Sequence, residues 1–569
     1  MKRKLVKLLA LLFVVCMIFT ACTNGGEETP DKTTSPPEAT QKPADETDDP
    51  NPPEEVGTGY WGRYEEPVVV RFAVNGADDD FSWSDNIWTQ AWKERFNIET
   101  EIMWNTGTDE AYQTKLSMAI LTGELPDYIY VNNNQFKQLV DAGYAADITD
   151  AYDNYLYPHV KETAFEAYEE AQELAFVDGK RYGIAQGGAG NTNARLVYIR
   201  NDYMEKVGAE IPTTIEELID LGKSFVDAGL AKYALPLIGN VTGEAYSDIQ
   251  VVSNAYGVYP GIWVDDGSGG MTYGSIDPKM ESVLNIYKNL YDTGYIDPTF
   301  PTAVGDNLTE QIMNGEVGIL TGEFWVATWP LPSLLDDEGN VVDWTIIPVL
   351  PSESNSNFKV QATGSPADTN FIVVRNGYEH PDAIMKLINH RHAMLADPEL
   401  AEQDFHTFVD EEGNKIGNHM RCPIREYFDF PYINMMTSPH VTEAIDNNNM
   451  DALVHPHDEL QYENVTNYLK AVENGDQAAA NSGWAMYKLF YGEHSVFGSF
   501  YSNYIADRYI WDMRNKSTEN YERLWGTIKQ YENTFYVNYI SGSEDTTFAQ
   551  FVQEWNDMGG ELITYELNH

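Results

Sequence analysis

From residue 68 onward, short apolar runs that suit β-strands alternate with segments that suit helices. The first run, at 68–74, is apolar except for Arg71, and it is typical of a buried parallel strand. A helix over 87–96, a strand over 98–102, a helix over 115–121 and a strand over 127–131 follow it. This order predicts α/β sheets with crossover helices, and 569 residues are enough for more than one such unit.

The pattern continues beyond the first sheet. Strands are predicted at 194–199 and 371–374, and a helix near Pro381. Another helix is predicted to begin at Thr213, with Glu216 three residues on as its capping partner. The last third of the chain is predicted to be more helical and is very aromatic. Aromatic residues make up 13% of the whole chain, too many for a disordered chain, so large packed domains are expected.

The first 22 residues resemble the signal of a bacterial lipoprotein. A basic start precedes an apolar run over 8–19, too short for a membrane span of about 20 residues but typical of an export signal. Residues 19–22 resemble a lipobox, with Phe19 in place of the usual leucine. We therefore expect a signal peptide over 1–22 and a lipid (palmitate) anchor on Cys22, which holds the protein at the extracellular face of the cell membrane.

Residues 23–66 are rich in Thr, Glu, Asp and Pro and have few apolar side chains, so we expect a disordered tether. Once the signal is removed and Cys22 carries lipid, only Cys422 remains, so no intrachain disulfide is expected.

The charge of the chain excludes several partners. It has 36 Lys and Arg against 89 Asp and Glu, a formal net charge of −53. Nucleic acid needs a basic surface and is excluded, as is direct docking on an anionic membrane. A neutral or cationic ligand is easier to reconcile with this charge than a polyuronate.

Several motifs, each weak alone, follow one another in a characteristic order. They lie at 121–129, 178–185, 198–202, 212–218, 294–298, 314–318 and 559–568. In this order and spacing the chain resembles the extracellular solute-binding proteins of family 1, the carbohydrate-type binding components of ABC importers, in their long Gram-positive form.

The resemblance implies an α/β fold of two hinged lobes, the type II "Venus flytrap" of periplasmic binding proteins. It places the N-terminal lobe at 67–186 and 324–395, and the C-terminal lobe at 187–323 and 396–569. It further implies a monomer without enzymatic activity or cofactor. Such a protein captures a carbohydrate between its lobes and delivers it to the permease subunits of an importer.

Sugars require aromatic platforms and planar polar side chains, placed on loops that follow strands. After the first strand, Asp78 resembles the Asn-Gly-Asp turn of maltose-binding-type proteins, and Trp83 follows it. After the third strand come Asn132, Asn134 and Gln135, of which the last two match charged sugar-contacting positions in those relatives. Helix capping is the alternative role for this Asn-rich loop.

The other candidates lie at the hinge and in the second lobe. Gln186 lies at the hinge, and Glu244 with Tyr246 resembles a Glu-Pro-Tyr element that holds sugar. Trp325, with Glu323 two residues before it, matches a sugar-stacking position in the relatives, with a core tryptophan as the alternative. Two weaker aromatic candidates are Trp263 and Trp484.

No metal site is predicted. The stretch at 225–232, where some long relatives carry a calcium loop, lacks the alternating oxygen ligands. The main rival function is a secreted polysaccharide-active enzyme, which needs a pair of carboxylates across a cleft. A surface adhesin without a transporter, and a binding protein for cargo other than sugar, also stay open.

Overall fold

The computed structural model describes residues 59–76, 82–162, 172–186, 194–243, 246–362, 369–397, 400–409, 415–424, 433–454, 456–514, 516–543 and 545–569. The predicted signal peptide, Cys22 and residues 23–58 of the predicted tether lie outside this part. The packed chain begins before Pro67, because the Tyr64 N–H donates to the carbonyl of Phe96 (3.0 Å) and Lys386 Nζ donates to that of Gly62 (2.8 Å).

The N-terminal strands form as predicted, with small shifts at their ends. β1 (Val68–Val74) pairs in parallel with β2 (Ile98–Asn105). β3 (Tyr128–Asn132) and β6 (Ile184–Gln186) flank β13 (Asn370–Val374), and both pairings are antiparallel. The Asp127 N–H donates to the carbonyl of Arg71 (2.9 Å), which joins β1 to the segment that leads into β3.

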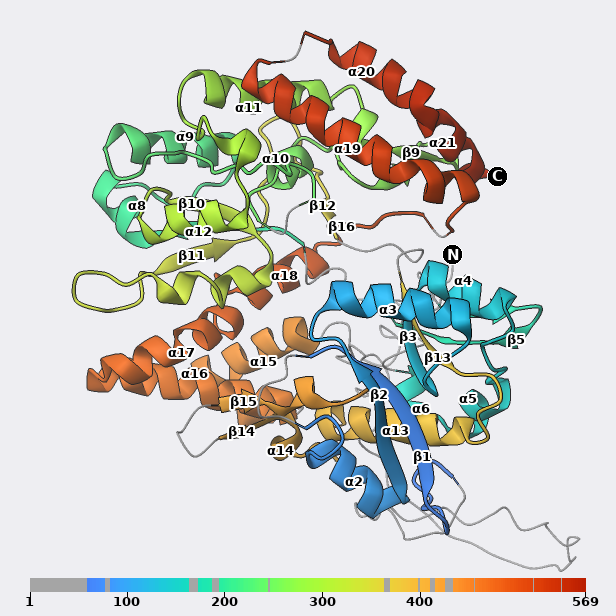
Figure 1. Cartoon of the computed structure of the whole chain (residues 1–569). Helices are drawn as coiled ribbons and strands as arrows, with labels where there is room; N and C mark the ends of the chain where they lie inside the picture. The colour runs from blue at the N-terminus through green and yellow to red at the C-terminus, as the bar shows by residue number, and fades with distance from the viewer. Residues whose placement is uncertain are drawn as a thin grey trace, which may run out of the picture. The chain divides into compact units, whose positions relative to one another are not determined.

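Helices cover both faces of this sheet (Figure 1). Because side chains alternate along a strand, Ile372 and Val374 of β13 pack on one face, with α2 (Ile87–Phe96) and α13 (Pro381–Ala396). Phe371 and Val373 pack on the other face, with α3 (Asp109–Thr122) and α4 (Asn133–Asp141). The layered α/β organisation follows from this alternation.

A second sheet orders its strands β10 (Ile319–Gly322), β7 (Leu196–Arg200) and β11 (Trp344–Ile347), all antiparallel. All five residues of β7 are buried. The helices of this region are α8 (Asn201–Val207), α9 (Ile215–Asp227), α10 (Gln250–Ala255), α11 (Met280–Asp292) and α12 (Gly305–Met313).

The last part of the chain is mostly helical, as predicted, and its apolar side chains join the core of the second sheet. Its main helices are α15 (Ile433–Asp446), α16 (Pro456–Asn474), α17 (Gln477–Phe490), α18 (Val496–Ile505), α19 (Glu519–Ser541), α20 (Phe548–Trp555) and α21 (Glu561–Asn568). Two-stranded pairs complete the fold: β4 (Phe176–Val177) with β5 (Lys180–Arg181), β8 (Trp263–Asp265) with β9 (Met271–Tyr273), β12 (Val360–Gln361) with β16 (Tyr509–Ile510), and β14 (Thr407–Val409) with β15 (Lys415–Gly417).

The cores divide the chain differently from the predicted lobe boundaries. Apolar side chains between 326 and 362 pack with the second sheet, because β11 hydrogen-bonds to β7. The predicted segments placed this stretch in the N-terminal lobe. Conversely, Phe405, Cys422 and Ile424 pack with α13 in the N-terminal core, beyond the predicted boundary at 395.

The predicted start of α9 is wrong by one residue. Thr214, not Thr213, is the N-cap, and its hydroxyl accepts the N–H of Glu217 (3.2 Å). The Glu217 carboxylate in turn accepts the N–H of Thr213 (2.7 Å).

None of the helices in the described ranges combines the length and the apolar content that a membrane span requires.

Candidate functional site

Three polar residues lie side by side at one end of the adjacent strands β3, β13 and β6. Asn370, the first residue of β13, lies opposite Asn132 on one side and opposite Gln186 on the other. The structure therefore brings two of the predicted contact residues, Asn132 and Gln186, into one row, and it adds Asn370, which the sequence analysis missed.

Gln186 is a buried amide that lies at the end of β6. Its side chain is 6% exposed, and neither Nε2 nor Oε1 has a hydrogen-bond partner in the described part of the chain. Its backbone carbonyl accepts the Thr369 hydroxyl at 2.9 Å. A buried amide costs free energy unless it is hydrogen-bonded, so Gln186 is poised to receive a polar group.

The Asn-rich loop performs the alternative role of helix capping. Asn132 Oδ1 accepts the N–H of Gln135 (3.0 Å), and Gln135 Oε1 accepts the N–H of Asn132 (3.1 Å), which makes a capping box at the start of α4. The Gln135 amide also donates to Gln113 (2.8 Å). Asn134 is exposed and donates to the Glu522 carboxylate (2.5 Å). Capping explains why Asn132 and Gln135 are amides without requiring a ligand.

Trp83 packs on the turn that follows β1. A Cβ atom on Gly76 would lie 2.2 Å from the Trp83 ring, so only glycine allows this close approach. The turn is fixed by Asn105, whose amide donates to the Gly76 carbonyl (3.0 Å) and accepts the Gly76 N–H (3.0 Å). Asp78, the other candidate here, lies outside the described residues, as does Glu244 in the second lobe.

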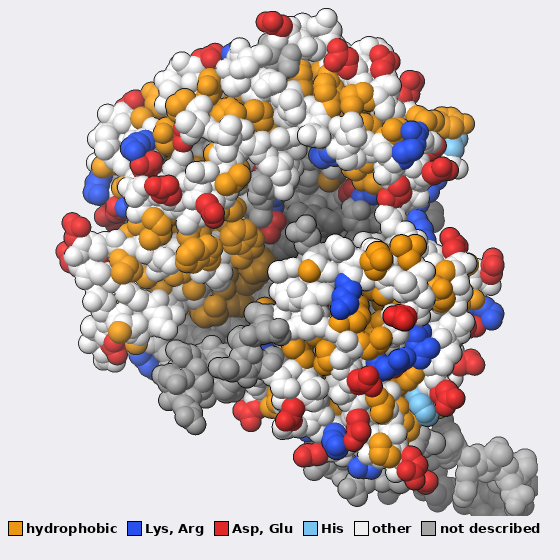
Figure 2. Space-filling view, viewed as in Figure 1, with side chains coloured by type: hydrophobic (Ala, Val, Ile, Leu, Met, Phe, Trp, Pro, Cys, Tyr) orange, Lys and Arg blue, Asp and Glu red, His pale blue; other side chains and the backbone are white. Residues whose placement is uncertain are grey.

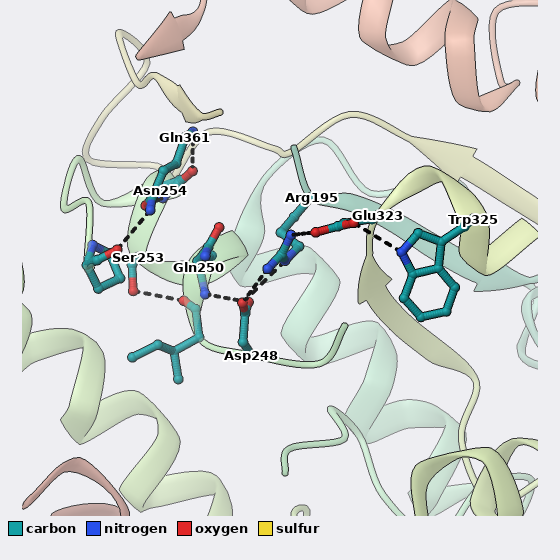
Figure 3. Close-up of polar contacts among 10 residues, drawn as sticks. Arg195, Asp248, Gln250, Ser253, Asn254, Glu323, Trp325 and Gln361 are labelled. Carbon is teal, nitrogen blue, oxygen red and sulfur yellow. Dashed lines mark hydrogen bonds and ion pairs between the residues drawn. The ribbon is translucent and has the colours of Figure 1, made fainter. Parts of the chain in front are cut away.

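A buried ionic group lies at the edge of the second sheet, where β7 begins and β10 ends (Figure 3). Arg195 donates through Nε (3.2 Å) and Nη2 (3.0 Å) to Oδ2 of Asp248, and through Nη1 (2.8 Å) to Oε1 of Glu323. The side chains of Arg195 and Asp248 are 5% and 0% exposed, and that of Glu323 is 15% exposed. We call Arg195, Asp248 and Glu323 the ionic triad.

The triad orients Trp325, the strongest aromatic candidate from the sequence. Trp325 Nε1 donates to Glu323 Oε2 at 3.0 Å, while Glu323 Oε1 is held by Arg195. The Tyr246 ring meets the indole edge to face, at a centroid distance of 5.3 Å and an interplanar angle of 84°. Trp325 is partly exposed, so its indole is fixed in orientation and still offers surface.

Two features of the site are energetically costly: the burial of Glu323 and the backbone conformation of Ser247. Burial raises the pKa of Glu323, although the charge of Arg195 acts in the opposite direction. Ser247, immediately before Asp248, has φ of +56°, a left-handed conformation that costs a non-glycine residue roughly 1–2 kcal/mol. Backbone strain of this kind concentrates at functional sites.

Buried amide side chains on α10 and β12 continue the line of polar groups that the triad begins. Figure 3 shows the side chains of Gln361, Asn254 and Gln250 continuing the line that Trp325, Glu323, Arg195 and Asp248 begin. We call these seven residues the polar row. Asn254 Oδ1 accepts the Gln361 N–H (2.7 Å), and Gln361 Nε2 donates to the Pro260 carbonyl (2.8 Å). These amides were not predicted from the sequence, although two amides within the otherwise small and apolar run at 249–255 are a recognisable signal.

The two weaker tryptophan candidates lie in the core. Trp263 is 1% exposed and packs among Tyr273, Trp525 and Trp555. Trp484 is 3% exposed, and its indole donates to Asp343 (3.2 Å). The packing favours a core role for both.

Apolar surface surrounds the segment that carries Trp325. Figure 2 shows hydrophobic side chains gathered where α12 and the two short helices after β10 lie, η5 (Phe324–Ala327) and η6 (Leu331–Ser333). Trp329 is 56% exposed, and its backbone N–H donates to the carbonyl of Trp325 (2.9 Å). A second aromatic surface thus lies one helical turn from Trp325, which the sequence analysis did not identify.

A separate hollow of about 440 Å³ lies between α9 and α11, lined among others by Glu216, Lys223, Tyr256 and Asn289. The Tyr256 hydroxyl donates to Glu216 (2.7 Å). For metals, the described residues contain no group of three His, Cys, Asp or Glu side chains able to hold an ion.

Sequence comparison identifies related proteins. The family model of bacterial extracellular solute-binding proteins matches residues 78–390, more than half of the chain. The polygalacturonan/rhamnogalacturonan-binding protein YtcQ of Bacillus subtilis is 23% identical over 40% of this chain and 44% of its own length. Lipoprotein LipO of the same organism is 22% identical over 39% and 43%. The matched stretch thus spans less than half of either relative.

Solved structures show the same fold. An extracellular solute-binding protein from Bifidobacterium longum subsp. infantis has a TM-score of 0.57 at 14% identity, over 88% of this chain and 97% of its own. The S. pneumoniae substrate-binding protein FusA, in complex with fructo-nystose, has a TM-score of 0.54 at 14% identity, over 88% and 98%. This likeness confirms the predicted two-lobed α/β fold.

Proposed function

Because the chain belongs to the family of bacterial extracellular solute-binding proteins, we propose that it captures a carbohydrate, most simply an oligosaccharide, and delivers it to an ABC importer. The observation that carries the proposal is Trp325. Its indole is partly exposed, fixed through Nε1 by Glu323 and supported at the edge by Tyr246. An oriented aromatic surface beside buried polar groups is the arrangement that the flat, hydroxylated faces of a sugar require.

The rest of the biological role forms part of the same proposal. The protein is a monomer that binds without turnover, is anchored by lipid on Cys22 at the extracellular face of the membrane, and docks on permease subunits. The lipobox-like sequence at 19–22 and the tether behind it support the anchor. The relatives named above support sugar as cargo, since one is described as a polygalacturonan/rhamnogalacturonan-binding protein and another was solved with fructo-nystose.

Isothermal titration calorimetry against a panel of oligosaccharides tests the proposal. We expect at least one saccharide to bind, and Trp325→Ala to weaken its binding by at least about 1 kcal/mol, roughly fivefold in Kd. The matched control is Tyr565→Ala, which removes an aromatic side chain that is 60% exposed on α21. Unchanged affinity of the Trp325 variant would contradict the assignment, and release of shorter saccharides during incubation would favour the rival enzyme.

A further inference from the structure

We propose that Gln250 and the ionic triad make this site selective for a neutral ligand whose hydroxyl groups donate hydrogen bonds, and that they reject uronates. The inference rests on the carbohydrate-binding function proposed above and names its ligand class. It adds Gln250 as a contact residue.

Gln250 carries a buried hydrogen-bond acceptor that no donor among the described residues reaches. Its side chain is 5% exposed, and Oε1 has no hydrogen-bond partner among the residues that the structure describes. Its backbone N–H is engaged, donating to Asp248 Oδ1 at 3.0 Å, so α10 begins directly on the triad. In Figure 3 the side chain lies between those of Asn254 and Arg195, with the amide oxygen pointing away from Asp248. Burying an acceptor of this kind costs free energy unless another molecule donates a hydrogen bond to it.

Ser247, three residues before Gln250, also carries a buried polar group of this kind. Its hydroxyl is completely buried and has no partner within the described ranges, although its N–H donates to the Thr321 carbonyl (2.7 Å). Two polar groups without hydrogen-bond partners in the described part of the chain therefore lie on either side of Asp248 in sequence, and Ser247 itself is held in a left-handed conformation. This concentration at one point of the fold indicates a place prepared for polar atoms of a ligand.

The triad sets the charge of that place. One guanidinium faces two carboxylates, so the group has one more acid than base. Arg195 is 4% exposed and uses Nε and both terminal nitrogens on these carboxylates, which commits it to the protein rather than to an anionic ligand. A uronate carboxylate brought beside this group would place a further negative charge in a poorly solvated region, where unpaired charge is strongly disfavoured.

The geometry also orders the contacts. Trp325 and Glu323 form the accessible end of the polar row, and Gln250 lies further along it, between Arg195 and Asn254. A sugar stacked on Trp325 would direct its hydroxyls inward, and a donor O–H satisfies the Gln250 oxygen where a carboxylate cannot. Carboxylate and amide acceptors on the protein thus match the donors of a neutral polyol.

The test of charge selectivity is calorimetry of the full chain with two sets of probes. The neutral set is malto-, cello-, xylo-, fructo- and galacto-oligosaccharides together with carboxyl-reduced oligogalacturonides. The acidic set is oligogalacturonides and alginate oligosaccharides. We expect binding only within the neutral set. Tighter binding of an acidic probe than of every neutral one would overturn this inference and leave the carbohydrate function standing, whereas no binding in either set would overturn both.

The test of Gln250 compares two substitutions. Gln250→Leu removes the acceptor, so we expect affinity for the neutral ligand to fall about tenfold, while the melting temperature stays the same or rises because an unpaired buried amide is gone. Gln250→Asn keeps a neutral amide acceptor and should retain more of the affinity than Gln250→Leu. Asn289→Ala, in the hollow between α9 and α11, is the control and should change nothing. Unchanged affinity in Gln250→Leu, or a large fall in its melting temperature, would show a structural amide and overturn the role.

Discussion

Arg195→Met is the perturbation that examines the ionic triad most sharply. Methionine fills the space of the alkyl stem but removes three hydrogen bonds of 2.8–3.2 Å to two carboxylates. Asp248 is completely buried and Glu323 largely so, and both would lose the guanidinium that they contact. Breaking a buried ion pair by removing one partner costs about 3–5 kcal/mol. We expect a loss of that size in the free energy of unfolding near neutral pH.

The dependence on pH identifies the cause of the loss. Without Arg195, its guanidinium no longer offsets burial, which penalises the anionic form of the two carboxylates in the folded protein. Protonation then favours the folded state, so the deficit relative to the natural chain shrinks as the pH falls. Burial already raises the pKa of Glu323 with Arg195 present, which points to Glu323 as the first group to take up a proton.

The assay is equilibrium urea unfolding at about pH 8 and about pH 5.5, with Arg95→Met as the matched control. Arg95 pairs with Glu402 at the surface, where both side chains are more than a third exposed, so its loss should cost no more than about 1 kcal/mol. A loss below about 1 kcal/mol for Arg195→Met, or a deficit equal at both pH values, would show that Arg195 does not stabilise the two buried carboxylates.

Three further predictions concern the cores. Trp263→Ala should lower the free energy of unfolding by about 3–5 kcal/mol, because the indole is fully buried, while leaving the Kd for sugar unchanged in calorimetry. Burial acts to raise the pKa of Asp127, but hydrogen bonds from Arg71 and Arg375 outweigh it and lower the pKa, so Asp127→Asn should cost about 2–4 kcal/mol at neutral pH. That cost should disappear as the pH falls below about 4 in a urea series, since a depressed carboxyl pKa stabilises the fold only above it. Burial lowers the pKa of His390 to about 3, so this imidazole stays neutral in the folded protein while the unfolded chain binds a proton as the pH falls from 7 to 5. The natural chain therefore loses about 2 kcal/mol of stability over this range through His390, and His390→Phe should be spared that loss. An unaltered dependence of stability on pH would contradict this.

The sheets were predictable because strand patterns are local. The run at 68–74 contains enough apolar residues to be recognised as a strand from its own sequence, and β1 spans the same residues. The division between the cores was not predictable, because it depends on β11 pairing with β7 across more than 140 residues of chain. Hydrogen bonds between distant strands leave no periodic signal in either strand.

The site was predictable only where a motif carried it. Trp325 and Glu323 lie two residues apart in a recognisable motif, and in the structure Trp325 Nε1 donates a hydrogen bond to the Glu323 carboxylate. Arg195 lies 128 residues from Glu323 and 53 from Asp248, and no spacing rule connects residues so far apart. Composition alone also could not separate Trp263 from Trp325, because surroundings, not residue type, decide that one is buried and the other partly exposed.

The most direct measurement is calorimetric titration of the natural chain and of Trp325→Ala with the same oligosaccharide panel. We expect saturable binding of a saccharide by the natural chain and at least a roughly fivefold weaker Kd for the variant, with its fold intact by circular dichroism. The absence of binding by the natural chain to any saccharide, or identical affinities of the two proteins, would contradict the assignment of Trp325 to a carbohydrate site.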